Sequence, residues 1–209
     1  MAKVKICGIT NLEDAKVAQD AGADFLGFVF ADSPRRIEAD KARSIIENTS
    51  ADIKIVALFV NEDKDRVAEV ISTLGRVDVL QFHGDEMPEY CEQFKDIGII
   101  KAFRIKDKES IDKISEYSQI SYILLDAFHK DLYGGTGETF EWSLTKQAKR
   151  FNLPIFLSGG LNHENVKEAI LKTNPFCVDV SSGVEKDPGK KDPQLVKKFI
   201  AQAKSVKCG

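Results

Sequence analysis

The 209-residue sequence has few cysteines and no long apolar run. Its four cysteines, at positions 7, 91, 177 and 208, include no Cys-x-x-Cys pair, so we expect neither a metal site nor a disulfide framework. The longest unbroken apolar stretch, residues 55–60, is too short to cross a bilayer. A formal net charge of −3 from mixed signs argues against a nucleic-acid surface. Because no apolar leader precedes the first predicted strand, we expect a cytoplasmic protein.

What the sequence does contain is a regular alternation of two patterns. Eight short apolar runs typical of buried strands each end in polar or glycine residues, and a stretch of helical periodicity follows each one. The runs lie at residues 4–6, 25–30, 55–59, 79–82, 99–103, 122–125, 155–157 and 177–180. Strict alternation predicts a parallel sheet, and eight units predict an α/β fold, a (β/α)₈ TIM barrel with one domain over residues 1–209. An open doubly wound sheet is the alternative, but no Gly-x-Gly-x-x-Gly follows the first run.

The helical stretches carry recognisable start signals. Asn11 is a suitable N-cap for a helix over residues 12–18, with acidic residues in its first turn. Pro88 and Pro193 fit the first position of a helix, where a missing N–H costs nothing. The remaining helices are expected at residues 42–46, 64–74, 88–94, 109–117, 142–151, 165–171 and 193–203.

Polar residues at the carboxyl ends of the strands indicate where a site would lie. In a barrel of this type the catalytic face is built from these strand ends. Each residue also has a structural explanation: Cys7 as a small buried hydrophobe, or Asp126 as an acceptor of backbone N–H bonds. Their common location favours one shared site. The residues that this geometry gathers are Cys7, Arg36, His83, Arg104, Asp126 and Asp179.

Two loops rich in serine and glycine indicate a phosphate site. Gly159 and Gly160 follow the seventh run, and Ser181, Ser182 and Gly183 follow the eighth. Their backbone N–H groups can approach a ligand closely, and with a helical turn expected within residues 183–187 they would form the phosphate site common in this fold. The alternative is that these glycines only make tight turns. We therefore expect a ligand that carries a phosphate.

Seven motifs occur in order along the chain. They are residues 5–10 (KICGIT), 22–36 with its SPRR ending, 80–84 (LQFHG), 124–126 (LLD), 134–137 (GGTG) with Phe140 and Trp142, 157–161 (LSGGL) and 178–185 (VDVSSGVE). From Lys3 to about Lys198 the chain therefore resembles one known family, phosphoribosylanthranilate isomerase. Phe82 is a departure, because the family often has leucine there.

The resemblance implies an Amadori rearrangement in tryptophan biosynthesis, which converts N-(5′-phosphoribosyl)anthranilate to 1-(o-carboxyphenylamino)-1-deoxyribulose 5-phosphate with no cofactor or metal. Asp126 would be the general acid that opens the furanose ring, and Cys7 the general base that removes the C2′ proton. Arg36 would bind the anthranilate carboxylate, a task that suits a planar bidentate donor. His83 and Asp179 would line the pocket.

The resemblance also implies a phosphate held at Gly159–Gly160 and at residues 181–183. The glycines at 134, 135 and 137 suggest a loop that closes over bound substrate. We expect a small phosphorylated substrate as the partner, with no nucleic acid or membrane. The oligomeric state is not readable from the sequence, and a monomer is favoured over a homodimer.

Three other interpretations stay open. Indoleglycerol phosphate synthase shares the phosphate loops but needs a lysine at a strand end, whereas Lys101 lies inside the fifth run. The histidine-pathway isomerase has a carboxylate where this chain has Cys7. A non-catalytic barrel that binds a phosphosugar is the third, and the presence of both Cys7 and Asp126 counts against it.

Overall fold

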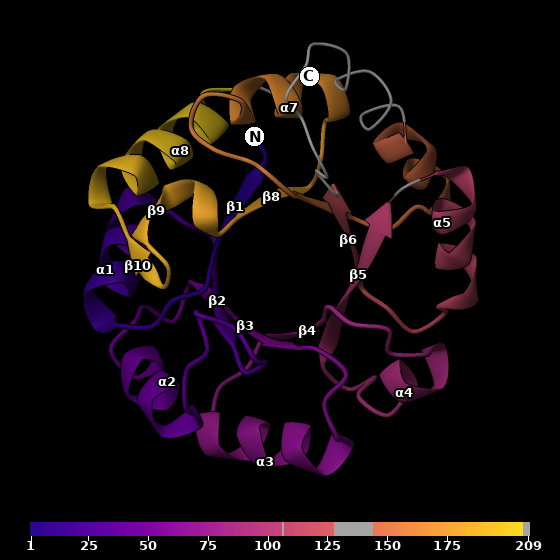
Figure 1. The fold of residues 1–209 in the computed structure, drawn as a ribbon, viewed down its shortest axis with the longest axis horizontal. Helices are drawn as coiled ribbons and strands as arrows, with labels where there is room; N and C mark the ends of the chain where they lie inside the picture. Colours follow the sequence, from indigo (N-terminus) through magenta and orange to yellow (C-terminus); the bar gives the residue numbers. More distant parts are fainter. Residues whose placement is uncertain (106, 128–143, 207–209) are drawn as a thin grey trace.

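Eight parallel strands form a closed barrel in the computed structural model, which describes residues 1–105, 107–127 and 144–206. Each strand pairs with the next, and β8 pairs with β1 to complete the ring (Figure 1). The predicted TIM barrel is therefore confirmed, and the open sheet is wrong. The strands are β1 (Lys3–Cys7), β2 (Phe25–Val29), β3 (Lys54–Phe59), β4 (Val79–Phe82), β5 (Gly98–Ile105), β6 (Tyr122–Ala127), β7 (Ile155–Ser158) and β8 (Cys177–Val180).

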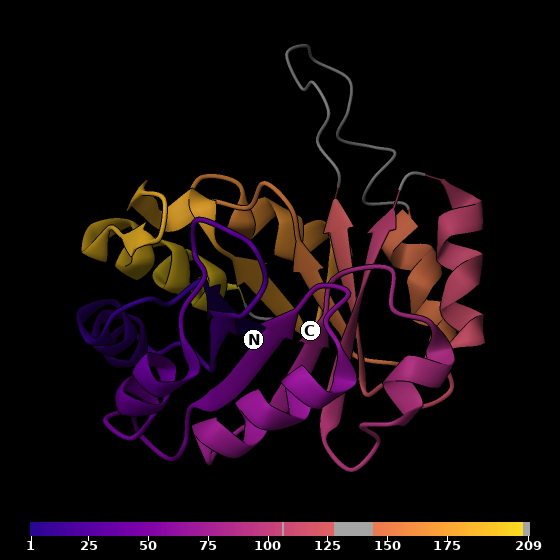
Figure 2. The same ribbon diagram turned by 60° about the horizontal axis from the view of Figure 1, so that its bottom comes forward.

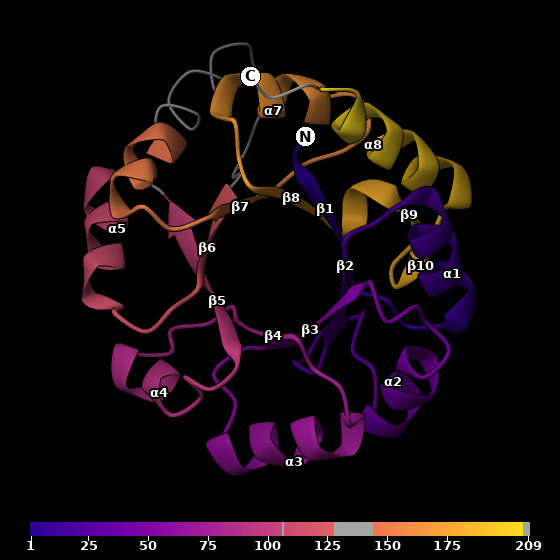
Figure 3. The same cartoon turned by 180° about the vertical axis from the view of Figure 1, so that it is seen from behind.

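Helices surround the barrel, as the view from behind in Figure 3 also shows. The Asn11 side chain accepts a hydrogen bond from the backbone N–H of Asp14, and Gly22, with φ of 95°, ends the same helix. The stretch expected as one helix over residues 109–117 is instead α5 followed by a 3₁₀ turn, η1 (Lys113–Glu116). The helices are α1 (Leu12–Ala21), α2 (Ala39–Ile46), α3 (Lys64–Leu74), α4 (Pro88–Glu92), α5 (Lys108–Asp112), α7 (Val166–Thr173) and α8 (Pro193–Ser205).

Two apolar layers hold the barrel together. A large cluster fills the space between strands and helices, and a smaller one fills the barrel interior. Inside the barrel, the rings of Phe25 and Phe156 meet edge-to-face with centroids 5.3 Å apart, and Phe156 meets Tyr122 in the same way at 5.4 Å. The interior is thus packed at this level, and a ligand can enter only from an end of the barrel.

Carboxylates close the amino-terminal end of the barrel. Asp24, just before β2, accepts hydrogen bonds from the backbone N–H of Val4 and from Lys3 Nζ, both at 2.9 Å. Asp78, just before β4, repeats the arrangement with the N–H of Ile55 at 2.9 Å and Lys54 Nζ at 2.8 Å. Each carboxylate therefore satisfies a strand-end donor and carries a lysine partner. A cavity of about 660 Å³ lies at this end.

The segment after β8 differs from its prediction. A 3₁₀ turn, η3 (Ser182–Val184), comes first, and then a short hairpin of β9 (Glu185–Asp187) and β10 (Lys190–Lys191). The helical turn expected within 183–187 thus begins one residue earlier, at Ser182, and residues 185–187 are a strand. Gly189, with φ of 77°, makes the tight turn between the two strands of the hairpin. Figure 2 shows this hairpin at the end of the barrel toward which the strand arrows point.

Several predicted features lie outside the described residues. These are the glycine-rich loop at 134–137 with Phe140, the start of the helix expected at Trp142, and Cys208. Over the described ranges, no helix is long and apolar enough to cross a membrane, and no group of His, Cys, Asp and Glu could hold a metal ion.

Candidate active site

A cavity of about 390 Å³ at the carboxyl ends of the strands brings together every predicted site residue except Arg36 and Arg104. The side chains come from different strands, so only closure of the barrel places them in one site. The predicted residues that line it are Cys7, His83, Asp126, Gly159, Gly160, Asp179, Ser181, Ser182 and Gly183.

Cys7 ends β1 and is 6% exposed. It pairs in register with Gly27 of β2, where a Cβ atom would lie only 2.8 Å from the Cys7 Sγ atom. The missing side chain of Gly27 therefore makes room for the thiol. Burial raises the pKa of the Cys7 thiol, and the nearby Lys5 ammonium only partly offsets this effect. Burial at this position therefore favours the thiol form of Cys7 over the thiolate.

Lys5 was not among the predicted site residues, although it contacts two of them. Its Nζ atom is fully buried and donates to both carboxylate oxygens of Asp179, at 3.0 and 3.1 Å. Burial lowers the pKa of Lys5, but the carboxylate of Asp179 and the Cys7 sulfur raise it, so the ammonium stays charged. The signal in the sequence was a lysine in the middle of an apolar run.

Asp126 lies within β6, one residue before its end, and two strands separate β6 from β1 in the ring. Its side chain is 31% exposed, and its Oδ2 atom is 3.2 Å from His83 Nε2. Gln81 Nε2 donates to His83 Nδ1 at 2.8 Å. With this orientation of the Gln81 amide, Nδ1 is an acceptor, and a proton on His83 Nε2 points at Asp126. Gln81 is a second functional contact that sequence reasoning missed.

The two serine-glycine loops have the backbone that close approach requires. Gly159 and Gly160 have φ angles of 89° and 62°, in the left-handed region that favours glycine. A Cβ atom at Gly183 would lie 1.9 Å from the carbonyl oxygen of Leu161, so the two loops touch at a point that only glycine permits. The hydroxyl of Ser181 is buried and has no hydrogen-bond partner among the described residues. Such a group can serve a ligand.

Arg36 is placed away from the cavity. Its side chain is about half exposed, and Nε lies 3.6 Å from Glu38 Oε1. The neighbouring Arg35 does line the cavity, and it donates from two nitrogens to Glu185 at 2.8 and 2.7 Å. The role of Arg36 therefore stays a prediction. Arg104, also expected on this rim, lines an adjacent cavity of about 530 Å³ that shares His83 with the first.

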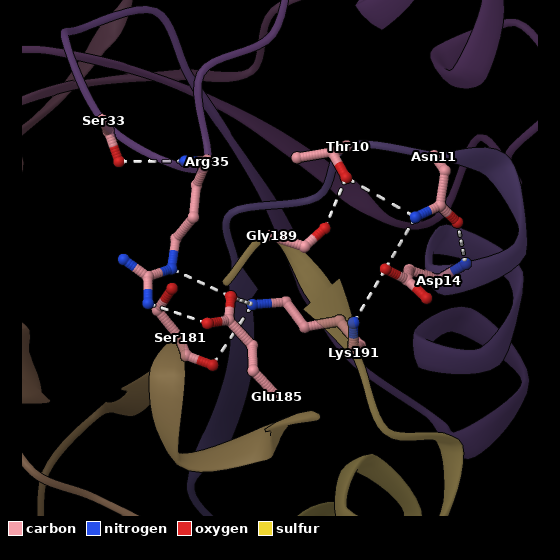
Figure 4. A network of polar contacts seen from close by, with 9 residues as sticks. All are labelled: Thr10, Asn11, Asp14, Ser33, Arg35, Ser181, Glu185, Gly189 and Lys191. Atoms are coloured by element: carbon pink, nitrogen blue, oxygen red, sulfur yellow. Dashed lines mark hydrogen bonds and ion pairs between the residues drawn. The ribbon is translucent and has the colours of Figure 1, made fainter. Parts of the chain in front are cut away.

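A polar network fixes the loop that carries Arg35 (Figure 4). Lys191 Nζ donates to Glu185 at 2.8 Å and to the carbonyl oxygen of Ser181 at 3.2 Å, so Glu185 lies between two cations. Burial raises the pKa of Glu185, but the hydrogen bonds and charges of Arg35 and Lys191 together lower it by more. The pKa of Glu185 is therefore below its ordinary value. The loop after β2 and the serine-glycine loop after β8 are thus joined.

Comparisons with known proteins give one consistent family. The family model described as N-(5′-phosphoribosyl)anthranilate (PRA) isomerase matches residues 4–202. The chain is 49% identical to the N-(5′-phosphoribosyl)anthranilate isomerase of Geobacter sulfurreducens over 98% of this chain and 99% of that protein. It is 45% identical to the enzyme of the same name from Thermoanaerobacter sp. over 99% of this chain and 100% of that protein.

Solved structures agree with the sequence comparison. The chain resembles the crystal structure of phosphoribosyl anthranilate isomerase from Thermotoga maritima with a TM-score of 0.89 and 42% identity, over 99% and 100% of the two chains. A second structure of such an isomerase, in complex with reduced 1-(o-carboxyphenylamino)-1-deoxyribulose 5-phosphate, matches with a TM-score of 0.87 and 40% identity over the same shares.

Proposed function

This chain belongs to the N-(5′-phosphoribosyl)anthranilate isomerase family, and from that premise we propose how its residues divide the reaction between them. It is an isomerase of tryptophan biosynthesis. The single observation that carries the proposal is that a thiol and a carboxylic acid group, Cys7 and Asp126, line one cavity beside two glycine loops. For this substrate, an aldose-to-ketose rearrangement needs a general acid, a general base and a binding site for the phosphate.

Asp126 is the general acid in this proposal. It protonates the furanose ring oxygen, the C1′–O bond breaks, and the nitrogen lone pair forms an iminium. A hydrogen bond between His83 Nε2 and Asp126 Oδ2 fixes the orientation of the Asp126 side chain. Because the Asp126 side chain is 31% exposed, it can regain a proton from solvent after each turnover.

Cys7 is the general base. As a thiolate it takes the proton from C2′, the C1′=C2′ bond forms, and the iminium nitrogen accepts the electron pair. The resulting enolamine becomes the ketone by proton transfer from the C2′ hydroxyl to C1′. The low exposure of Cys7 keeps water away from the sulfur while the proton moves.

The phosphate of the substrate binds at the loops after β7 and β8. Gly159 and Gly160 allow backbone N–H groups to face the cavity, and the Ser181 hydroxyl supplies a buried donor without another partner among the described residues. The remaining contacts come from Ser182 and Gly183 at the start of η3. This arrangement binds a dianion without committing a lysine to it.

The anthranilate carboxylate binds Arg36 in this proposal. The Arg36 side chain must rotate from Glu38 toward the cavity, and the 3.6 Å contact between exposed groups opposes that rotation only weakly. Arg35 is the less suitable partner, because Glu185 already occupies two of its nitrogens.

We also propose that residues 1–209 make a single domain, which acts in the cytoplasm as a monomer and needs no cofactor. In addition, we propose that Asp179 belongs to the active site through its contact with Lys5. The lining of the cavity by Asp179 supports the last point. Sedimentation analysis tests the monomer directly, and a species of twice the chain mass would contradict it.

The test of the function is loss of anthranilate-type fluorescence when purified protein is mixed with N-(5′-phosphoribosyl)anthranilate. We expect turnover by the wild-type chain and at least about 100-fold slower turnover by Asp126→Asn. The alternative hypothesis is a non-catalytic barrel that binds a phosphosugar. Such a protein would bind a reduced product analogue, but the fluorescence would decrease only at the uncatalysed rate.

A further inference from the structure

A buried ion pair lies directly beneath Cys7. Lys5 of β1 and Asp179 of β8 are paired in register, and the side chains of both are almost completely buried. Since successive side chains of a strand alternate, Lys5 and Cys7 project to the same face of β1. Apolar residues of similar volume commonly stabilise a core as well as such a pair does. Fold stability therefore gives no reason for two charges at this position.

The ammonium of Lys5 has three protons, and Asp179 accounts for two of them, with Oδ1 and Oδ2 accepting at 3.0 and 3.1 Å. The Cys7 sulfur lies on the same face of β1 and is the candidate acceptor for the third. At Gly27 a Cβ atom would lie 2.8 Å from Cys7 Sγ and 3.1 Å from Lys5 Cε. The same missing side chain thus makes room for both the cation and the thiol.

We propose that Lys5 and Asp179 are positioning residues that balance the thiol and thiolate forms of Cys7, with Lys5 donating to the sulfur and Asp179 limiting that donation. This rests on the proposed role of Cys7 as the base. A base must lose its own proton before the reaction and accept one during it, so neither form can dominate strongly. Lys5 alone would favour the thiolate, and burial alone would favour the thiol.

The directions of the local effects agree with this balance. Burial is the largest cause that raises the pKa of Cys7, Lys5 is the largest that lowers it, and Asp179 raises it again. Asp32 of the loop after β2 also lines the cavity, and four other titratable groups around it are engaged in different pairs. They are Lys191 of β10 and Arg35 of the loop after β2, which bind Glu185, and His83 and Asp126 across the cavity, which bind each other.

The test is the pH dependence of Cys7 alkylation by iodoacetamide, followed on the Cys7 peptide by mass spectrometry. Lys5→Met should move the midpoint up, and Asp179→Asn should move it down, each by about 1 to 3 pH units. A merely structural role gives a different result: disruption would expose the thiol and move both midpoints in the same direction. Shifts in the same direction, or no shift in either variant, would overturn the proposal.

Lys5→Met leaves the Asp179 carboxylate buried without its cation, so this variant can fail to fold. The double variant Lys5→Met/Asp179→Asn then provides the test, because it removes both charges and nearly keeps their volumes. Lys5 lowers the pKa of Cys7 by more than Asp179 raises it. The alkylation midpoint of the double variant should therefore lie above that of the wild type. An unchanged or lower midpoint would overturn the proposal.

Lys101→Met is the matched control. Lys101 is also a buried lysine of a barrel strand, 3.2 Å from Glu86, and it lines the adjacent cavity. This variant should leave the Cys7 midpoint unchanged. The alkylation result is independent of catalysis, so the two proposals can fail separately. If Cys7→Ser keeps its turnover, the assignment of the base fails. If Cys7 is the base, the acidic limb of the kcat profile should move with the alkylation midpoint.

Discussion

The two ends of the barrel both carry charged residues beside a cavity, but they use them differently. At the amino-terminal end Asp24 and Asp78 each bind a lysine and a backbone N–H. At the carboxyl end Ser181 offers a buried hydroxyl that has no partner among the described residues, and Asp126 contacts the ring of His83 at 3.2 Å. The larger cavity, about 660 Å³, lies at the amino-terminal end. Unsatisfied groups therefore locate the chemistry better than volume does.

Backbone geometry explains the difference. Parallel strands present unpaired N–H groups at their first residues, and a carboxylate just before a neighbouring strand is well placed to accept from them. The strand ends at the opposite face lead into loops whose donors are free to point at a ligand. The comparison predicts that substitutions at the carboxyl end reduce turnover, whereas substitutions at the amino-terminal end reduce stability.

The largest effect is expected at the acid. Asp126→Asn keeps the shape of the side chain but has no acidic proton, so kcat should fall by about 10²–10⁴-fold with little change in the affinity for a reduced product analogue. The measurements are steady-state fluorescence kinetics and calorimetric binding. If KM rises while kcat is unchanged, Asp126 binds substrate and is not the acid.

A smaller effect is expected for the carboxylate anchor. Arg36→Met should weaken binding of product analogues that carry the anthranilate carboxylate by about 2–4 kcal/mol, because a desolvated charge pair is lost. An analogue without that carboxylate should bind almost as before. Equal losses for both analogues would show that Arg36 has a structural role. Arg35→Met serves as the neighbouring comparison, and it should instead loosen the contact with Glu185.

The reverse outcome is expected at the amino-terminal end. Asp78→Ala leaves the N–H of Ile55 without its acceptor and should lower the free energy of unfolding by about 1–3 kcal/mol, while kcat stays unchanged. Urea denaturation gives the free energy of unfolding, and the fluorescence assay gives kcat. A loss of kcat without a loss of stability would break the proposed distinction between the two ends.

The smallest effect concerns pH. Burial raises the pKa values of Asp24 and Asp78, but hydrogen bonds from Lys3 and Lys54, those from the backbone N–H groups and the nearby cations together lower them by more, so both are below the ordinary value. Their contribution to stability is complete above the unfolded-state pKa of about 3.9 and is lost as the pH falls through the folded-state values. The urea concentration at the unfolding midpoint of the wild type should thus decrease below about pH 4. The midpoint of Asp78→Asn should decrease less over the same pH range. Parallel curves would contradict this assignment.

The barrel was predictable from the sequence because eight apolar runs alternate with helical periodicity and leave only short connections. The loops at Gly159–Gly160 and at Ser181–Gly183 were predictable for a similar local reason, since each directly follows a strand. The proposed phosphate site is therefore visible as a pattern before any distance is known.

Contacts inside the barrel could not be predicted in the same way. Lys5 and Gln81 are polar residues within apolar runs, and their partners are set by the register of β1 with β8 and by the direction of β4 side chains. Arg35 and Arg36 are adjacent in sequence, so composition could not tell which one faces the cavity. Only the network of Arg35 with Glu185 and Lys191 distinguishes them.

The most direct test of the account is the turnover of Cys7→Ser compared with that of Cys91→Ser. Both cysteines are buried, but only Cys7 lines the cavity at the carboxyl ends of the strands. We expect Cys7→Ser to bind the reduced product analogue normally and to lose at least about 100-fold in kcat, because a hydroxyl is a far weaker base. Cys91→Ser should keep wild-type kcat. Near-wild-type turnover by purified, folded Cys7→Ser would contradict the account.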